Sequence, residues 1–314
     1  WASKKVDGAD IVNAFSDYAL LTLRRARARG AVTVVERGSS HILLQKELLT
    51  EEYERLGLGE LRMDGRLIAR QLREYEEADY VLVNSAFALT SYVARGISPQ
   101  RLMLVPLGVD LSHFHPVPKA DDVFRIVTVA GGVRKGLRYL IDAVRALKLP
   151  NLEVLILGGI AREEAPMLSG CAGLVRVMGK IPHREMHRHY SQGSVFVSAS
   201  LEDGWGHVVS EAMACGVPVI CSTHTGAADM VREGRDGFVV PVRDGEALRE
   251  KLVFLYEREA DRRVMGREAR ARAADFSWEA YGRRVTAEYG RILGARVASG
   301  AENGAGDPHR SRES

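Results

Sequence analysis

The chain has 314 residues, a formal net charge of +3 and a hydrophobic fraction of 46%, which is typical of a globular protein with one large or two medium domains. No apolar run is long enough to span a membrane, and no signal-peptide pattern follows Trp1. The small net charge gives no general footprint for binding nucleic acid.

Cysteine and arginine usage point to a cytoplasmic protein. Cys171, Cys215 and Cys221 form neither a paired framework nor a metal-type spacing, which favours a reducing compartment. Arginines gather in LRRARARG and DRRVMGREARARA. Such helix faces are usually solvated surfaces, and here they would also allow peripheral contact with anionic lipid at a membrane.

The first part of the chain, residues 1–117, shows only a few strand and helix patterns. The runs AVTVVE, DYVLVNS and RLMLVPLG indicate strands, and helical stretches are expected over 43–55 and 61–77. This content is typical of a small or incomplete α/β unit. The segment HFHPVPKADD, with two prolines among polar residues, marks the boundary of this unit.

From residue 118 to residue 276, short β-branched runs alternate with helical patterns. The runs are FRIVTVA, LEVLILGG, LVRVMG, VFVSAS, VPVICS and GFVVPV. They lack period-two alternation, so we expect a parallel sheet that is buried on both faces. A helix over 277–297 should begin at Ser277 as its N-cap, and residues 298–314 have too little to bury and should be disordered.

A basic, glycine-rich loop, VAGGVRKGL, follows the first of these strands. Ligands of open α/β sheets bind at the carboxyl ends of strands, so Gly132, Arg134 and Lys135 are candidates for holding a phosphate or diphosphate. The loop is neither a Walker motif nor a GxGxxG fingerprint. The alternative is a plain glycine turn with two solvated cations.

A second loop, in LEDGWGHVVSEAMACG, carries acids and glycines. Gly204 and Gly206 would free backbone amides beside Asp203, and Glu211 lies on the next helix, where its carboxylate could accept hydrogen bonds from a ribose diol. Exposed helix acids or a glycosidase pair are the alternatives, but a hydrolase needs no diphosphate loop. The sequence contains no Asp-x-Asp pair for a divalent metal, so Arg134 and Lys135 would neutralise a leaving diphosphate.

Three segments, RKGLRYLIDA, EDGWGHVVSEAMACGVPVICSTHTGAADMVREGRDGFVVPVRD and VPLGVDLSHFHP, together resemble the retaining glycosyltransferases of family 4. The resemblance covers nearly the whole chain. It implies the GT-B fold, with two Rossmann-like α/β domains facing a cleft, and a first, acceptor-side domain that is shortened. It also implies metal-independent transfer of a sugar from a UDP- or GDP-type donor to a hydroxyl acceptor, which could be a saccharide, a lipid-linked molecule or a small molecule, without a further cofactor.

The resemblance also assigns roles to residues. Glu211 would bind the ribose and Asp203 would lie near the transferred sugar, although the family usually has Glu there and Glu202 precedes it. His41, just beyond a predicted strand, would orient the donor sugar or the acceptor, or is a hydrogen-bonded loop histidine. The expected donor contacts are Gly132, Arg134, Lys135, Lys180, Ile181, Gly204, Trp205, Gly206, His207, Val208 and Glu211, with Lys180 and Ile181 beside the base.

Other readings of the sequence remain open. The run HREMHRH has the order HxExH, not the zinc-protease order HExxH, and no metal site is expected. A chain with a shortened first domain could bind a nucleotide sugar with little or no transfer. A GT-B nucleotide-sugar epimerase would use the same grip on its donor.

Overall fold

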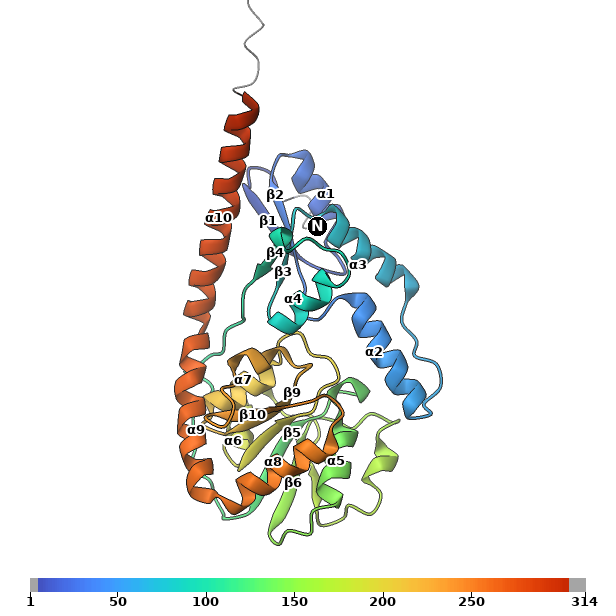
Figure 1. The fold of residues 1–314 in the computed structure, drawn as a ribbon, viewed down its shortest axis with the longest axis vertical. Coiled ribbons are helices and arrows are strands. Elements are labelled where there is room, and N and C mark those ends of the chain that lie inside the picture. The colour runs from blue at the N-terminus through green and yellow to red at the C-terminus, as the bar shows by residue number, and fades with distance from the viewer. Residues whose placement is uncertain (1–4, 305–314) are drawn as a thin grey trace, which may run out of the picture.

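The computed structural model describes residues 5–304 and shows two α/β domains joined by a linker (Figure 1). The first domain contains a parallel sheet in the order β1-β2-β3-β4. Its elements are β1 (Ile11–Phe15), α1 (Leu20–Ala28), β2 (Val32–Glu36), α2 (Ile42–Arg55), α3 (Gly65–Glu77), β3 (Tyr80–Val83), α4 (Ala86–Val93) and β4 (Leu102–Leu104).

Most elements of the first domain match the sequence patterns, and the differences have local causes. The strand β1 and the helix α4 were not predicted, because each is short and carries polar residues. The helix α3 begins four residues later than residue 61, since the Asp64 side chain accepts a hydrogen bond from the backbone amide of Arg66 and caps the helix there.

The second domain is built on a parallel sheet in the order β10-β9-β8-β5-β6-β7. Its strands are β5 (Phe124–Val129), β6 (Leu152–Leu157), β7 (Val175–Val177), β8 (Val195–Ser198), β9 (Val219–Ser222) and β10 (Gly237–Val240). Its helices are α5 (Leu137–Arg145), α6 (Met186–Tyr190), α7 (His207–Ala214), α8 (Gly245–Glu257) and α9 (Glu259–Ala273). All residues of β8 and β9 are buried, which explains why these runs show no polar alternation.

The strand order places a crevice beside β5. From β5 the chain adds β6 and β7 on one side, and then returns to place β8, β9 and β10 on the other side. The loops that follow β5 and β8 therefore leave the sheet in opposite directions at its carboxyl edge. Such a switch point is where open α/β sheets bind their ligands.

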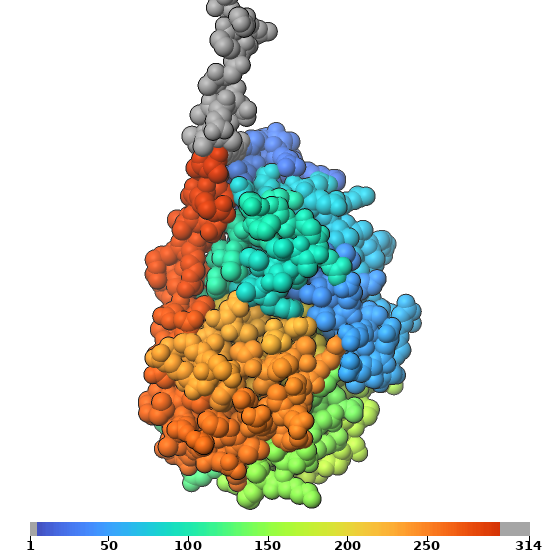
Figure 2. Space-filling view, in the orientation of Figure 1, coloured from blue at the N-terminus to red at the C-terminus, as the bar shows by residue number. Residues whose placement is uncertain are grey.

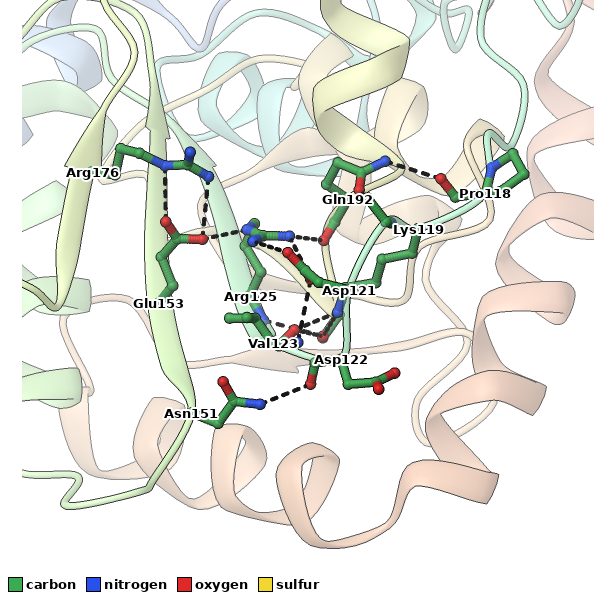
Figure 3. Close-up of polar contacts among 12 residues, drawn as sticks. Pro118, Lys119, Asp121, Asp122, Val123, Arg125, Asn151, Glu153, Arg176 and Gln192 are labelled. Atoms are coloured by element: carbon green, nitrogen blue, oxygen red, sulfur yellow. Dashed lines mark hydrogen bonds and ion pairs between the residues drawn. The ribbon is translucent and has the colours of Figure 1, made fainter.

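The opposite, amino-terminal edge of this sheet is closed by a network of charges (Figure 3). Arg125 in β5 is buried and bonds to Asp121, at 2.8 Å, and to Glu153 in β6. Glu153 also pairs with Arg176 in β7, at 2.8 Å. These groups pair with one another, so much of their charge is neutralised within the network.

The last helix, α10 (Trp278–Gly304), returns to the first domain, as Figures 1 and 2 show in red. Ser277 accepts a hydrogen bond from the amide of Ala280 and is the expected N-cap. Ile292 is buried against Val34 and Met103 of the first sheet. The helix continues over residues 298–304, part of the range for which the sequence predicts disorder, and residues 305–314 lie outside the described chain.

Within residues 5–304, no helix is both long enough and apolar enough to cross a membrane.

Candidate functional site

Two loops meet at the crevice and bring opposite charges together. The loop after β5 carries Arg134 and Lys135 in a 3-10 turn, and the loop after β8 carries Glu202 and Asp203. Lys135 Nζ lies 2.5 Å from Asp203 Oδ2, and Arg134 Nη1 lies 3.3 Å from Glu202 Oε2. The structure thus places both predicted cations beside both candidate acids.

Gly136 sets how closely these loops approach each other. It precedes α5 with a φ of 64°, and a Cβ at this position would lie 2.0 Å from the carbonyl oxygen of Ala199, just after β8. A side chain would force the loops apart. Gly132, at the start of the turn, has open space around its Cα, so its backbone stays accessible to a ligand.

Glu202 and Asp203 face different parts of the molecule. Glu202 is fully buried and accepts hydrogen bonds from the Ser40 amide, at 2.8 Å, and from Gln45 Nε2, at 2.7 Å. Both donors belong to the first domain. Asp203 instead faces Lys135 within the second domain. The Asp203 side chain therefore pairs with the basic loop through Lys135, and Glu202 links the same loop, through Arg134, to the first domain.

Glu211 lies on α7, 9% exposed, and its carboxylate is held by two neighbours. The Tyr190 hydroxyl donates a hydrogen bond of 2.8 Å to Oε2, and His183 Nε2 lies 3.3 Å from Oε1. Burial, followed by the charge of Glu211, raises the pKa of Tyr190 well above its usual value. The phenol therefore keeps its proton and holds the Glu211 carboxylate in one orientation.

The first domain is docked directly onto the loop that begins α7. A Cβ on Gly204 would lie 2.3 Å from the carbonyl oxygen of Gly38, and the Gly204 carbonyl accepts a hydrogen bond of 2.6 Å from Ser85 Oγ. Asp229 Oδ2 accepts a hydrogen bond of 2.7 Å from the amide of Ala86, at the start of α4. The candidate site is thus enclosed by both domains.

The other predicted donor contacts take varied positions. Trp205 is buried against Phe276, so its side chain belongs to the core. Gly206 is the N-cap of α7 and His207 is its first residue. Val208 is partly buried and packs against the hydrophobic core of the second domain. Lys180 is exposed and Ile181 is half-buried in the segment after β7, which an antiparallel bridge between Gly158 and Gly179 holds beside the end of β6.

His41, for which the sequence left open a role at the donor or acceptor and a hydrogen-bonded loop position, is buried in the first domain. It is 3% exposed, and its ring lies between Tyr75 and Tyr92, with centroid distances of 5.1 Å to each. Its Nδ1 accepts a hydrogen bond from the amide of Leu43 and caps α2. The structure therefore supports the alternative of a hydrogen-bonded histidine at the start of a helix.

Four residues of this region were missed by the sequence analysis: Gln45, Ser85, Tyr190 and Asp229. Each contacts an acid or a backbone group that is remote in the sequence, such as Tyr190 on Glu211. Tyr190 is an aromatic residue between the polar runs HREMHRH and SQGS, and this isolated position could have suggested a buried phenol. The other three carry no local pattern that distinguishes them from surface residues.

Comparison with known proteins shows a match to a protein family and to curated relatives. Residues 124–258 match the family model described as Glycosyl transferases group 1. D-inositol 3-phosphate glycosyltransferase of Mycolicibacterium gilvum is 30% identical over 244 residues, which cover 69% of this chain and 53% of the relative. The chain spans about half the length of the curated relatives that it matches.

Solved structures show the same arrangement of domains. Sucrose-phosphate synthase from Thermosynechococcus elongatus superposes with a TM-score of 0.73 and 25% identity, covering 92% of this chain and 75% of that one. The Anabaena protein HepE, in complex with UDP-glucose, gives 0.73 and 18% identity, covering 92% and 82%. The described chain therefore has the GT-B fold of two Rossmann-like domains, and its residues 124–258 match the Glycosyl transferases group 1 family.

Proposed function

We propose that this chain is a retaining, metal-independent glycosyltransferase that moves a sugar from a UDP- or GDP-type donor to a hydroxyl acceptor. The observation that carries the proposal is the pairing of Arg134 and Lys135 with Glu202 and Asp203 at the carboxyl edge of the second sheet. The helix α7, which follows the acidic loop, carries Glu211 with its carboxylate held by Tyr190. A diphosphate needs cations there, and a ribose and a sugar need carboxylates that accept hydrogen bonds.

The charges of the site suit the reaction. As the bond from sugar to phosphate breaks, positive charge develops on the sugar and negative charge grows on the leaving diphosphate. Arg134 and Lys135 would stabilise the diphosphate, and Asp203 would lie beside the sugar. In the described structure these cations are neutralised by Glu202 and Asp203, so donor binding would exchange one set of anions for another.

The similar proteins support the donor and the acceptor class. HepE was solved with UDP-glucose, and a TarM variant of S. aureus was solved with UDP and alpha-GlcNAc-glycerol. The curated relatives are named as glycosyltransferases of inositol 3-phosphate. A uridine nucleotide is therefore the first donor to test, and polyols and saccharides are the first acceptors.

Titration calorimetry with UDP, GDP and their sugar conjugates, each with and without EDTA, tests this proposal. We expect one nucleotide to bind and EDTA to leave its affinity unchanged. The double variant Arg134→Ala, Lys135→Ala should lose about 2 to 4 kcal/mol of binding free energy, because two charge-assisted contacts disappear. Unchanged affinity in this variant would refute the diphosphate site.

Transfer and binding alone are then separated by product analysis. A glycosylated acceptor supports the transferase. Binding without any product would favour the alternative of a nucleotide-sugar-binding protein, and a converted sugar nucleotide without acceptor would favour an epimerase.

We also propose a cytoplasmic location with peripheral contact to a membrane. The surface around α1 supports this, because Phe15, Tyr18 and Leu21 are each more than two-thirds exposed, beside the partly exposed Arg24 and Arg27. Sedimentation with vesicles of anionic and of zwitterionic lipid is the test. Equal binding to both, or to neither, would contradict it.

A further inference from the structure

A buried carboxylate of the first domain lies close to the donor loops, although the donor site does not use it. Glu36 is the last residue of β2 and is only 5% exposed. Two residues later, the backbone at Gly38 meets Gly204 of the acidic loop. Two residues of chain span at most about 7 Å, so Glu36 is near this contact between the domains.

This carboxylate has one free oxygen and no cation beside it. Within residues 5–304, its hydrogen-bond donor is the Asn13 amide, 3.0 Å from Oε2, and no lysine or arginine pairs with it. Its Oε1 accepts no hydrogen bond in this part of the chain and is not one of the unpaired atoms sealed from solvent, so it keeps an open surface. Burial raises the pKa of Glu36, against the opposing effect of the Asn13 hydrogen bond. Because buried acids are normally paired, this open acceptor is suited to a hydrogen-bond donor on a ligand.

The crossing helix α10 brings aromatic side chains to the same face of the sheet (Figure 1). Tyr281 and Tyr289 pack beside Val34, which lies two residues before Glu36 in β2 and therefore on the same face. Tyr289 also accepts a hydrogen bond of 3.1 Å from Asn13. Burial, and then the charge of Glu36, raise the pKa of Tyr281 to about 12. Tyr281 is thus a neutral phenol near the carboxylate.

Trp278 extends this face of α10 past the end of the sheet. It lies three residues before Tyr281, about 4.5 Å along the helix axis toward the second domain, and the two rings are 5.4 Å apart. Its side chain rests on the backbone at Gly108, where an added Cβ would lie 2.6 Å from Trp278 Cδ2. Trp278 is nevertheless 45% exposed. An indole that is held in this way offers a rigid apolar surface to a ligand.

The second domain continues this surface toward the donor site. The ring centroid of His207, the first residue of α7, lies 6.3 Å from that of Trp278. Burial lowers the pKa of His207, and the nearby charges of Glu211 and Asp203 oppose this effect. The surface that begins at Glu36 therefore ends beside both acids of the donor site.

We propose that the surface formed by Glu36, Tyr281, Trp278 and His207 binds an uncharged saccharide or cyclic polyol. Hydroxyl groups of the ring donate hydrogen bonds to Glu36, and its apolar face lies on Trp278. Carboxylates accept hydrogen bonds from hydroxyls, and the C–H groups on one face of such a ring pack well on an indole. An anionic ring would be repelled, because no cation neutralises Glu36. If the proposed function holds, this ring is the acceptor.

Four uncharged rings test the proposal: methyl α-glucopyranoside, methyl α-mannopyranoside, methyl α-galactopyranoside and myo-inositol, each titrated into the full chain with and without UDP. Acrylamide quenching of tryptophan fluorescence reports on Trp278, since Trp205 is buried. We expect at least one ring to bind and to reduce quenching, and glycerol, which has hydroxyls but no ring, to leave quenching unchanged. Glu36→Gln should lower the affinity about three- to tenfold through loss of a charge-assisted hydrogen bond. Trp278→Leu should lower it about threefold or more and remove the protected fluorescence.

Two matched controls should bind the rings as the wild-type chain does. Glu257→Gln removes an exposed acid at the end of α8, and Tyr18→Leu removes an aromatic ring that is 83% exposed. The proposal is overturned if no ring binds the wild-type chain, if a bound ring leaves quenching unchanged, or if folded Glu36→Gln or Trp278→Leu protein binds as tightly as the wild type. UDP or GDP binding without ring binding would refute this site alone, and ring binding without nucleotide binding would refute the proposed function alone.

Discussion

The Tyr190 hydroxyl holds Glu211 in place, so Tyr190→Phe is a selective test of the proposed ribose contact. Phenylalanine keeps the ring in the cluster with Phe114 and Phe196, and its main loss is the 2.8 Å hydrogen bond. We expect the affinity for UDP or GDP to fall about three- to tenfold, since one hydrogen bond contributes about 1 kcal/mol. Affinity for pyrophosphate, which has no ribose, should stay the same in calorimetry; equal losses for both would contradict the role of Glu211.

His41 makes stability depend on pH. Burial, followed by the charges of Arg95 and Arg37, lowers its pKa from 6.5 to about 4. The unfolded chain therefore binds a proton more readily than the folded one between these values. The free energy of unfolding is therefore not reduced by His41 above pH 6.5, where both states leave it neutral, and it decreases as the pH falls from 6.5 toward 4.

Urea unfolding at pH 7.5 and pH 5 checks this expectation. The wild-type chain should lose free energy of unfolding at the lower pH, and His41→Gln should lose less, because glutamine does not titrate. His115→Gln, an exposed histidine of the linker, is the control. A pH dependence that is the same in all three chains would place its origin elsewhere.

At the scale of elements, the sequence predicts what depends on local pattern. The β-branched runs of the second domain and the N-cap at Ser277 were confirmed, because buried parallel strands and helix caps have short signatures. The chain pattern also located the two loops of the site. The strand β1 was missed, since its residues become a strand only through pairing with β2.

The parts of the site that could not be predicted depend on contacts between distant segments. Nothing in EDG shows that Glu202 turns toward Ser40 while Asp203 turns toward Lys135. The sequence left the role of His41 open, and it did not show that Tyr75 and Tyr92 pack on its ring. The orientation of such side chains depends on contacts between distant segments, and a local sequence pattern does not predict these contacts.

The loop before α7 offers a test at this scale, Gly204→Ala. The new Cβ would lie 2.3 Å from the Gly38 carbonyl oxygen and 2.4 Å from Ser39 Cα, which are backbone atoms, so the domains must separate. We expect a larger radius of gyration in X-ray scattering and at least about a tenfold loss of sugar transfer. Gly159→Ala, where the added Cβ meets open space, is the control and should match the wild-type chain.

At the scale of the whole molecule, the two domains are joined by polar contacts at several places. Besides the contacts of Glu202, the Arg243 guanidinium reaches Glu51, Glu52 and the carbonyl oxygen of Leu48 on α2. Phe87 stacks on His224 with a centroid distance of 4.9 Å. Interfaces of this polar kind within a chain allow domains to move relative to each other.

Glu202 connects this interface to the basic loop, because one carboxylate binds Ser40, Gln45 and Arg134. In Glu202→Gln, the new NH2 group cannot accept a hydrogen bond, so one of these three donors loses its acceptor. The substitution also removes the negative charge that pairs with Arg134. If domain docking and the diphosphate site are coupled through Glu202, the variant should be more open in X-ray scattering without nucleotide. Its kcat should fall about tenfold or more, while the affinity for the nucleotide changes less than about threefold, because Arg134 and Lys135 remain to bind the diphosphate.

Glu153→Gln separates this effect from a general loss of stability. Glu153 also accepts from an arginine of the second domain, but it lies in the network at the far edge of the sheet (Figure 3), remote from the first domain. If both variants lose activity in proportion to their loss of thermal stability, Glu202 has no special place in the interface. A fall in kcat in Glu202→Gln alone, with docking lost in the same variant, means that the molecule uses this buried carboxylate to assemble its cleft.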